Sequence, residues 1–300
     1  MVNGFINLLK PPGPTSHDMV AFVRRLLGVK RVGHTGTLDP MAVGVLVVAV
    51  GRATRLISYL EDTKTYRGEI TFGKTTSTLD AGGDIKSVCP ASFQRQELDD
   101  VLPQFTGPIL QTPPMVSAVK WRGQRLYDLA RQGLEVERKP RPVVIHQLTV
   151  LSFIPDSSYP RALIECTCSA GTYIRSLAAD IGDALGVGAY LSFLLRAQSG
   201  AFTITNSLTP VELEEAVANK EVSHWLLPPE KGVQHLPAIT LCAHDTTLFI
   251  HGNMVPVKPA TGLSLNSTVR VHSYDGSFLG LGKPDLSSQG ASLKPTVVFN

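Results

Sequence analysis

The sequence has no hydrophobic run long enough to cross a membrane and almost no excess of charge. No stretch of about 18 uninterrupted apolar residues occurs, and the first residues, MVNGFINLLKPPG, lack the pattern of a signal or transit peptide. The formal net charge is +3, which is too small to indicate a nucleic-acid partner by itself. These absences predict a cytoplasmic protein without a membrane partner.

Cysteine is scarce and is not arranged for metal or redox chemistry. The four cysteines are Cys89, Cys166, Cys168 and Cys242, and no pair has the C-x-x-C spacing. The eight histidines contain no H-E-x-x-H pair. Cys166 and Cys168 lie two apart in an alternating segment, which places both on one face of a strand. The sequence predicts free thiols in the core and no metal site.

Helical and strand patterns alternate irregularly along the first 235 residues. An apolar helical pattern follows Ser16, a good N-cap, and ends at Gly28. The run VLVVAVG suits a strand buried on both faces. Further patterns predict strands at 64–73, 148–154 and 162–168, a loop at 75–86, and helices at 95–105, 123–133 and 173–185. This mixture favours an α+β fold with a mixed central sheet.

The composition changes after about Pro228. Residues 236–300 are rich in Pro, Gly and Ser, contain short β-like runs and have no helical periodicity. We therefore expect two domains, at 1–235 and 236–300, of which the second is small and all-β.

Positive charge is concentrated in the first two-thirds of the chain. Residues 1–205 hold 22 basic and 17 acidic side chains, whereas residues 206–300 hold 6 and 8. The segment 115–142 carries seven basic against three acidic residues, interleaved with Trp121 and Tyr127. This pattern indicates a phosphate-facing surface. An ordinary solvated helix face is the alternative.

The segment 68–75, GEITFGKT, matches the phosphate-loop pattern G-x-x-x-x-G-K-[ST]. A phosphate loop needs a glycine-permissive nest that opens a helix. Here Glu69 would place a negative charge at the phosphates, Ile70 and Phe72 prefer extended backbone, and loop formers follow Thr75. We therefore predict that this segment does not bind a nucleotide.

Four blocks of the sequence carry specific motifs: NLLKPPGPTSHDMVAFVRRLLGVKRVGHTGTLDPMAVGVLVVAVGRATR at 7–55, KTYRGEITFGKTTSTLDAGGDI at 64–85, FTGPILQTPPMVSAVKWRGQRLYDLARQG at 105–133 and CSAGTYIRSLAADIGDALGVGAYLSFLLRAQSGAF at 168–202. In order and spacing these blocks resemble the bacterial tRNA pseudouridine-55 synthases of the TruB type. The resemblance implies the pseudouridine-synthase fold with a thumb-like insertion at about 105–142. For the C-terminal part, the similarity to the family's PUA-like domain is weaker.

The resemblance implies an isomerase that moves the uracil of one uridine from N1 to C5 attachment, without cofactor or metal. Asp39 in GTLDP matches the essential carboxylate, Arg175 in GTYIR matches the arginine that pairs with it, and Tyr66 in KTYRG matches the tyrosine that stacks on the base and is a candidate for moving the C5 proton. By residue type alone, an Asp before Pro is a turn former, Arg175 suits a surface helix, and Tyr66 suits strand packing.

The resemblance also implies residues that bind the RNA. Tyr173 matches a second substrate-contacting tyrosine, Leu194 an apolar pocket wall, His34 a wedge that fills the vacated stack, and Lys10 a residue lining the site. Arg122 and Arg125 belong to the thumb, which closes on the T-stem-loop of tRNA through phosphates and shape. No protein partner is evident, and a monomer is expected.

One position departs from the family pattern of leucine followed by a basic residue. The chain has Leu194-Leu195-Arg196 there, so Arg196 would have to make the phosphate or pocket contact alone.

Two other classes of protein stay open from the residues alone. An RNA-binding or tRNA-folding protein would share the basic thumb and His34, yet it would not require Asp39, Tyr66 and Arg175 together. A nucleotide hydrolase would need the phosphate-loop match that the local sequence disfavours. The sequence also leaves open whether Asp39 attacks C1′ or assists departure of the base through a glycal-type intermediate.

Overall fold

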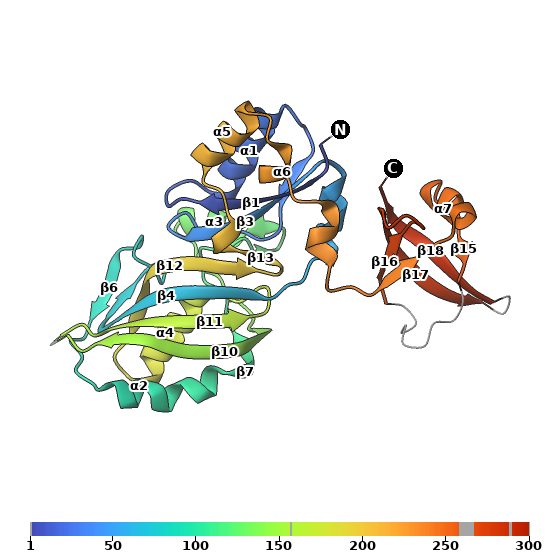
Figure 1. Cartoon of the computed structure of the whole chain (residues 1–300). Helices are drawn as coiled ribbons and strands as arrows, with labels where there is room; N and C mark the ends of the chain where they lie inside the picture. Colours follow the sequence, from blue (N-terminus) through green and yellow to red (C-terminus); the bar gives the residue numbers. More distant parts are fainter. Residues whose placement is uncertain (1, 157, 258–266, 288–289, 300) are drawn as a thin grey trace.

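The computed structural model describes residues 2–156, 158–257, 267–287 and 290–299, and it contains a large mixed sheet and a smaller sheet beside it (Figure 1). The large sheet has the strand order β1-β3-β12-β4-β11-β10-β7, with β2 beside β3 and β13 beside β12. Its strands are β1 (Gly4–Lys10), β2 (Val32–His34), β3 (Val43–Val50), β4 (Lys64–Phe72), β7 (Gly107–Gln111), β10 (Arg141–Ile154), β11 (Arg161–Cys168), β12 (Ala189–Ser199) and β13 (Phe202–Thr203). Among the described strands of the large sheet, only β3 and β12 pair in parallel. The predicted α+β fold with a mixed central sheet is confirmed.

Helices cover one face of the large sheet and contribute to its main core. The helices of this part are α1 (Ser16–Leu27), α2 (Arg95–Val101), α3 (Leu126–Arg131), α4 (Ile174–Ala184), α5 (Pro210–Ala218) and α6 (Val222–Trp225), with 3-10 segments η1 (Gly51–Tyr59), η2 (Leu102–Phe105), η3 (Ile204–Asn206) and η4 (Pro229–Val233). No helix in the described part of the chain is long and apolar enough to cross a membrane.

Both faces of strand β3 are apolar, as its sequence predicted. Leu46, Val48 and Val50 belong to the main core, whereas Val45 and Val47 face a second core. Each of these side chains is fully buried. A strand with both faces covered reads as a continuous apolar run, and this burial fixes the position of the loop that precedes it.

The N-cap of helix α1 lies one residue earlier in the sequence than we expected. Thr15, rather than Ser16, is the N-cap and forms a capping box with Asp18. Ser16 instead exchanges hydrogen bonds with the main chain of Leu38, at 2.8 and 3.1 Å. Gly28 ends the helix in the left-handed conformation, as predicted. The pair of hydrogen bonds ties the start of α1 to the residue before Asp39.

The segment 75–86, which was expected to be a loop, has a short strand at each end, and the two strands pair as a hairpin. Strands β5 (Lys74–Thr76) and β6 (Ile85–Val88) pair around a turn. The residues that match the phosphate-loop pattern form β4, a bend and β5, and no helix follows them. The extended backbone therefore excludes a phosphate loop here, as the local sequence predicted.

The thumb leaves the large sheet between β7 and β10. Residues 107–111 pair with residues 141–145, so part of the range predicted for the thumb belongs to the sheet. The segment between them contains β8 (Lys120–Trp121), β9 (Gln124–Arg125) and α3. The helix predicted at 123–133 is thus shorter and begins after a two-stranded turn.

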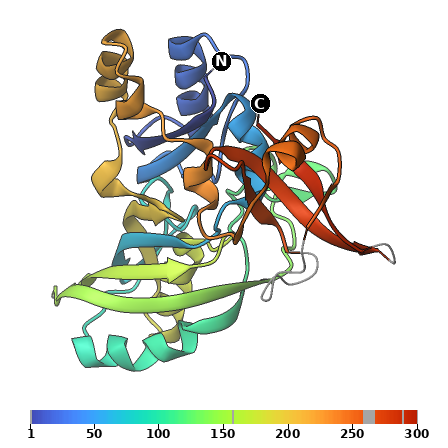
Figure 2. The ribbon, with the colours of Figure 1, turned by 45° about the vertical axis from the view of Figure 1, so that its right-hand side comes forward.

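The C-terminal part forms a five-stranded sheet (Figure 2). Its elements are β14 (Ala238–Thr240), α7 (Ala243–Ile250), β15 (Val255–Pro256), β16 (Val269–His272), β17 (Phe278–Ser287) and β18 (Gly290–Val298). The sequence pattern did not predict α7, whose buried apolar contact is Phe249. Leu281 and Val297 pack with Phe5 in the second core, so the smaller sheet contacts the large one.

Candidate active site

Five of the residues expected in the site line one cavity of about 270 Å³. They are Asp39, Tyr66, Tyr173, Arg175 and Leu194. They come from distant parts of the chain: the loop between β2 and β3, the strands β4 and β12, and the start of α4. Among the described residues, no three His, Cys, Asp or Glu side chains come together as metal ligands would.

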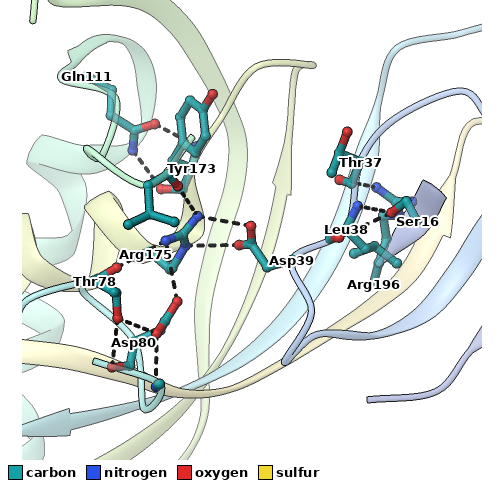
Figure 3. Close-up of polar contacts among 12 residues, drawn as sticks. Ser16, Thr37, Leu38, Asp39, Thr78, Asp80, Gln111, Tyr173, Arg175 and Arg196 are labelled. Carbon is teal, nitrogen blue, oxygen red and sulfur yellow. Dashed lines mark hydrogen bonds and ion pairs between the residues drawn. The ribbon is translucent and has the colours of Figure 1, made fainter. Parts of the chain in front are cut away.

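The Arg175 guanidinium contacts the Asp39 carboxylate through two nitrogen atoms (Figure 3). Nη2 donates to Oδ1 at 2.9 Å, and Nε lies 2.9 Å from Oδ2. The Arg175 side chain is 2% exposed, whereas that of Asp39 is 31% exposed. The arginine is therefore the fixed partner, and the carboxylate is presented toward the cavity.

Arg175 is itself held by three further oxygen atoms. It donates to the main-chain oxygens of Thr78 at 3.0 Å and Val116 at 2.9 Å. Its Nη1 also lies 3.3 Å from Asp80 Oδ2. One guanidinium thus joins the loop of Asp39, the β5–β6 hairpin and the thumb.

Asp80 is a site residue that the sequence did not indicate. Its Oδ1 accepts hydrogen bonds from the Thr78 hydroxyl and from the Gly82 main chain, and its side chain is 10% exposed. The stretch STLDAGGD reads as an ordinary turn, and turn formers mask a carboxylate that faces inward.

Two opposing effects act on the pKa of Asp39. Burial raises the pKa of its carboxyl above the ordinary value, and the negative charge of Asp80 adds to this rise. The Arg175 guanidinium and, more weakly, Lys10 oppose it. Arg175 therefore favours the ionised carboxylate against the effect of its partly desolvated position.

Two buried cations hold the main chain on both sides of Asp39. Lys10 Nζ donates to the oxygens of Pro11, Pro40 and Ala42 at 2.7 to 3.1 Å. Lys10 therefore braces the loop and does not line the cavity, contrary to the expectation from the resemblance. Burial lowers the pKa of Lys10 to about 8, against the attraction of Asp39.

Arg196 braces the other end of this loop from β12. It donates to the oxygens of Gly36 at 3.0 Å, Thr37 at 3.4 Å and Val45 at 2.7 Å. Its side chain lines the cavity although the residue is only 1% exposed. Gly44, at φ +114°, lets β3 pass close to this arginine, because a Cβ there would lie 2.3 Å from Arg196 O.

Tyr66 and Leu194 form the wall built by β4 and β12. Tyr66 pairs in register with Arg196, and Leu194 pairs with Gly68. Burial raises the pKa of the Tyr66 phenol, whereas Arg196 and its hydrogen bond to this residue oppose the rise. The hydroxyl is therefore protonated at neutral pH but lies beside a positive charge.

Tyr173 is positioned through its main chain by Gln111 of β7. The amide of Gln111 donates to Tyr173 O at 3.0 Å and accepts from Tyr173 N at 2.7 Å. Gln111 is 2% exposed. Sequence reasoning overlooked it, because a lone glutamine at the end of a strand gives no signal for this double contact.

His34 lies at the end of β2, near the cavity but not in its wall. Gly36 N–H donates to His34 Nδ1 at 3.3 Å. Burial, together with Arg196 and His17, lowers the pKa of His34, against the hydrogen bond from Gly36. The ring is thus neutral at neutral pH.

Arg122 and Arg125 lie on the thumb and outside this cavity. Both are exposed, with Arg122 stacked over Trp121 at 4.5 Å and Arg125 bonded to the Tyr127 hydroxyl at 3.0 Å. A second cavity, of about 330 Å³, is lined by Arg122 and by other basic residues of the thumb. The thumb therefore presents arginine and aromatic faces together.

Lys64 is a further cavity residue that the sequence did not indicate. It precedes Tyr66 by two residues on β4, just as Leu194 precedes Arg196 on β12. Because residues two apart share one face of a strand, this spacing could have identified both cations once Tyr66 and Leu194 were placed in the site.

Three family models match the chain in succession. Residues 24–174 match the TruB family pseudouridylate synthase N-terminal domain, residues 175–234 the tRNA pseudouridylate synthase B C-terminal domain, and residues 237–299 the pseudouridine synthase II TruB C-terminal domain. Together these models cover most of the chain.

Similar curated proteins and solved structures agree with these matches. The tRNA pseudouridine synthase B of Moorella thermoacetica is 48% identical over the whole of both chains, and that of Symbiobacterium thermophilum is 52% identical over 84% of this chain and 82% of its own. A Cbf5-Nop10-Gar1 complex is similar with a TM-score of 0.76 and 30% identity, and an H/ACA RNP bound to a substrate RNA has the same TM-score with 28% identity; each match covers 99% of this chain and 85% of the other. The chain belongs to the TruB family of pseudouridylate synthases, which are isomerases.

Proposed function

We propose that this pseudouridine synthase converts uridine 55 in the T-loop of tRNA to pseudouridine. The curated relatives that bear the name tRNA pseudouridine synthase B, at 41–52% identity, support tRNA as the substrate. The particular uridine rests on the resemblance of the four sequence blocks and on the arrangement of the cavity.

The isomerisation breaks the N1–C1′ bond of the target uridine and forms a C5–C1′ bond. The base rotates between the two steps, C5 then loses its proton, and N1 ends with a proton. No electrons are exchanged with a second molecule. The site must therefore retain the detached uracil and exclude water.

Asp39 supplies the negative charge beside the ribose in this proposal, and Arg175 aims it. Two routes use the same carboxylate. Asp39 can attack C1′ and form an ester, or it can assist departure of the base through a glycal-type intermediate. The paired geometry at 2.9 Å suits either route, because both need an ionised carboxylate at a fixed point.

Tyr66, Tyr173 and Leu194 hold the uracil in this proposal. The Tyr66 ring stacks on the base, and its protonated hydroxyl is a candidate for moving the C5 proton after the bond has formed, accepting that proton as it gives its own to N1. The buried Leu194 side chain provides an apolar wall. His34, neutral beside the opening, fills the gap that the flipped base leaves in the RNA stack.

The thumb, with Arg122 and Arg125, binds the backbone of the T-stem-loop. Its exposed arginines and aromatic rings suit phosphates and unpaired bases. A monomer in the cytoplasm is the expected form, because tRNA is the substrate and no other chain is needed to complete the cavity.

The observation that carries this proposal is the Arg175-held Asp39 in one cavity with Tyr66 and Leu194. The test is incubation of the purified protein with an unmodified tRNA transcript, followed by chemical mapping of pseudouridine. We expect one modified position, in the T-loop. Modification elsewhere, or none, would overturn the assignment of the substrate position.

A further inference from the structure

Two buried cations on the β4–β12 wall of the cavity have no part in the proposed chemistry. Lys64 is 9% exposed and Arg196 is 1% exposed, and both line the cavity that contains Asp39. They are separate from the arginine that holds Asp39.

The two cations converge on Gly36. A Cβ built on Gly36 would lie 3.4 Å from Lys64 Cε and 3.7 Å from Arg196 Nη1. Gly36 does not adopt a left-handed φ, so the backbone itself does not demand a glycine. The missing side chain therefore keeps space open where the two positive groups approach each other.

Neither cation has a carboxylate partner in the described part of the chain. Lys64 Nζ donates to Asp62 O at 2.9 Å, and Arg196 donates to three main-chain oxygens and to the neutral Tyr66 hydroxyl. Arg175 differs, because Asp39 and Asp80 both neutralise it.

The cavity is therefore electrostatically divided. On one side Arg175 is paired with the lining carboxylate of Asp39 and with Asp80, which does not line the cavity, whereas on the other side two cations lie beside the Tyr66 phenol. Burial and the neighbouring Arg196 lower the pKa of Lys64, which Asp62 partly opposes. A buried charge without a counter-ion is costly unless an anion completes it.

We propose that Lys64 and Arg196, together across Gly36, form a subsite for a phosphodiester group that flanks the target uridine. This inference rests on the proposed function and names a group of that substrate. An RNA nucleotide offers no other anion, and flipping it about its backbone carries its flanking phosphate toward the pocket. With the phosphate held here, the ribose lies between the two cations and Asp39.

This subsite differs from the thumb in what it contributes. The thumb cations are exposed, so salt screens them. Lys64 and Arg196 act inside the cavity, where screening is weak, and they contact the reacting nucleotide itself. The subsite thus positions C1′ as well as adding affinity.

The test is a double-mutant cycle between the protein and the RNA. The substrate is tRNA assembled with a single neutral methylphosphonate at the linkage on the 5′ side or on the 3′ side of the target uridine. The protein is wild type or Lys64→Met, which keeps the stem and removes the charge. Lys86→Met, on exposed strand β6, is the matched control. Arg196 is left intact because it braces the loop of Asp39.

Gly36→Ala provides a second variant that retains both charges. Its added methyl group makes contacts of 3.4 and 3.7 Å, which the fold can tolerate, but it occupies the space between the cations. Thermal unfolding of each variant measures whether the fold is retained. Binding and single-turnover rate are then measured for each pairing.

We expect one of the two neutral linkages to weaken binding by wild type and by Lys86→Met at least about tenfold. The same linkage should change binding by Lys64→Met or Gly36→Ala no more than about twofold, since the partner is already lost. Equal losses in wild type and Lys64→Met, or no loss at either linkage in wild type, would overturn the subsite. Failure of the proposed function is distinguishable, because wild type would then form no pseudouridine in the T-loop of unmodified tRNA.

Discussion

Arg175 orients the Asp39 carboxylate and favours its ionised form. The Nη2 and Nε atoms of Arg175 each lie 2.9 Å from one oxygen of Asp39. The arginine is almost fully buried and also contacts Thr78, Asp80 and Val116. Three chain segments that lie far apart in the sequence therefore fix one carboxylate. Changes to any of these segments should appear as changes in turnover.

Replacement of Asp39 by Asn tests the essential charge. The amide keeps the shape, so we expect tRNA binding within about tenfold of wild type and loss of turnover. Single-turnover assays and filter binding on the same preparation measure both quantities. Residual activity above about 1% of wild type would contradict the assignment of Asp39 as the essential carboxylate.

Asp80→Asn tests the second carboxylate on Arg175. The amide can still accept from Thr78 and Gly82, but it removes one negative charge from the arginine. Because the charge of Asp80 raises the pKa of Asp39, its removal should lower that pKa and shift the acid limb of kcat/KM toward lower pH. We also expect kcat to fall about tenfold, since Arg175 becomes less firmly placed.

Asp84→Asn is the control for Asp80→Asn, because Asp84 is exposed in the same hairpin. It should leave the pH profile unchanged. An Asp80→Asn enzyme with the wild-type acid limb would show that Asp80 has no electrostatic effect on Asp39.

The elements that local patterns specify were predicted well from the sequence. The buried strand β3 follows from the continuous apolar run VLVVAVG, and the helix that ends at Gly28 follows from apolar periodicity and a glycine cap. The cysteines 166 and 168 are both buried, as their spacing predicted. Helix α7 was not predicted, because only Phe249 of its eight residues is buried and the periodicity is therefore faint.

The sequence predicted only those residues of the site that lie in a recognisable motif. Asp39, Tyr66 and Arg175 lie in recognisable blocks and meet in one cavity. Asp80 and Gln111 reach the site through long-range contacts that a single sequence does not reveal, whereas Lys64 could have been found from its spacing of two residues from Tyr66 on one strand. For Lys10, the motif suggested a residue that lines the site, and the structure adds three carbonyl contacts that brace the loop of Asp39.

The lowered pKa of Lys10 predicts a pH-dependent contribution to stability. Below about pH 8 the amine is charged in the folded and the unfolded chain. Between about 8 and 10.5 the unfolded chain retains a proton that the folded chain has released. The free energy of unfolding should therefore rise with pH across this window, by roughly 3 kcal/mol at most for this group.

The measurement compares urea unfolding of wild type and Lys10→Met at pH 7 and pH 9.5. Wild type should gain stability relative to the variant between the two values. Lys86→Met, which removes an exposed lysine, should track wild type. A difference between wild type and Lys10→Met that does not change with pH would contradict the prediction.

The thumb prediction concerns salt. If Arg122 and Arg125 contact phosphates, neutralising both with Gln should weaken tRNA binding and flatten the slope of log affinity against log salt by roughly one to two units. Lys74 and Lys86 changed to Gln provide a control with the same loss of charge. An unchanged slope would show that the thumb arginines belong to an ordinary solvated surface and do not contact phosphates.

The Tyr66 hydroxyl can be separated from the Tyr66 ring by mutation. Tyr66→Phe keeps the stacking surface, so tRNA binding should stay near that of wild type. Product formation should slow at least about a hundredfold, because positioned proton transfer contributes typically 10²–10⁴ in rate. Rapid-quench assays on unmodified tRNA measure this effect.

A tRNA with 5-fluorouridine at the target position isolates the step that needs the hydroxyl. Its C5 carries no proton, so wild type should cleave and rotate the base without completing the usual rearomatisation. In Tyr66→Phe the same cleavage and rotation should still be detectable on this analogue, even though turnover on uridine is nearly lost. If Tyr66→Phe converts uridine at the wild-type rate, the hydroxyl takes no part in proton transfer, and the buried ring of Tyr66 acts through stacking alone.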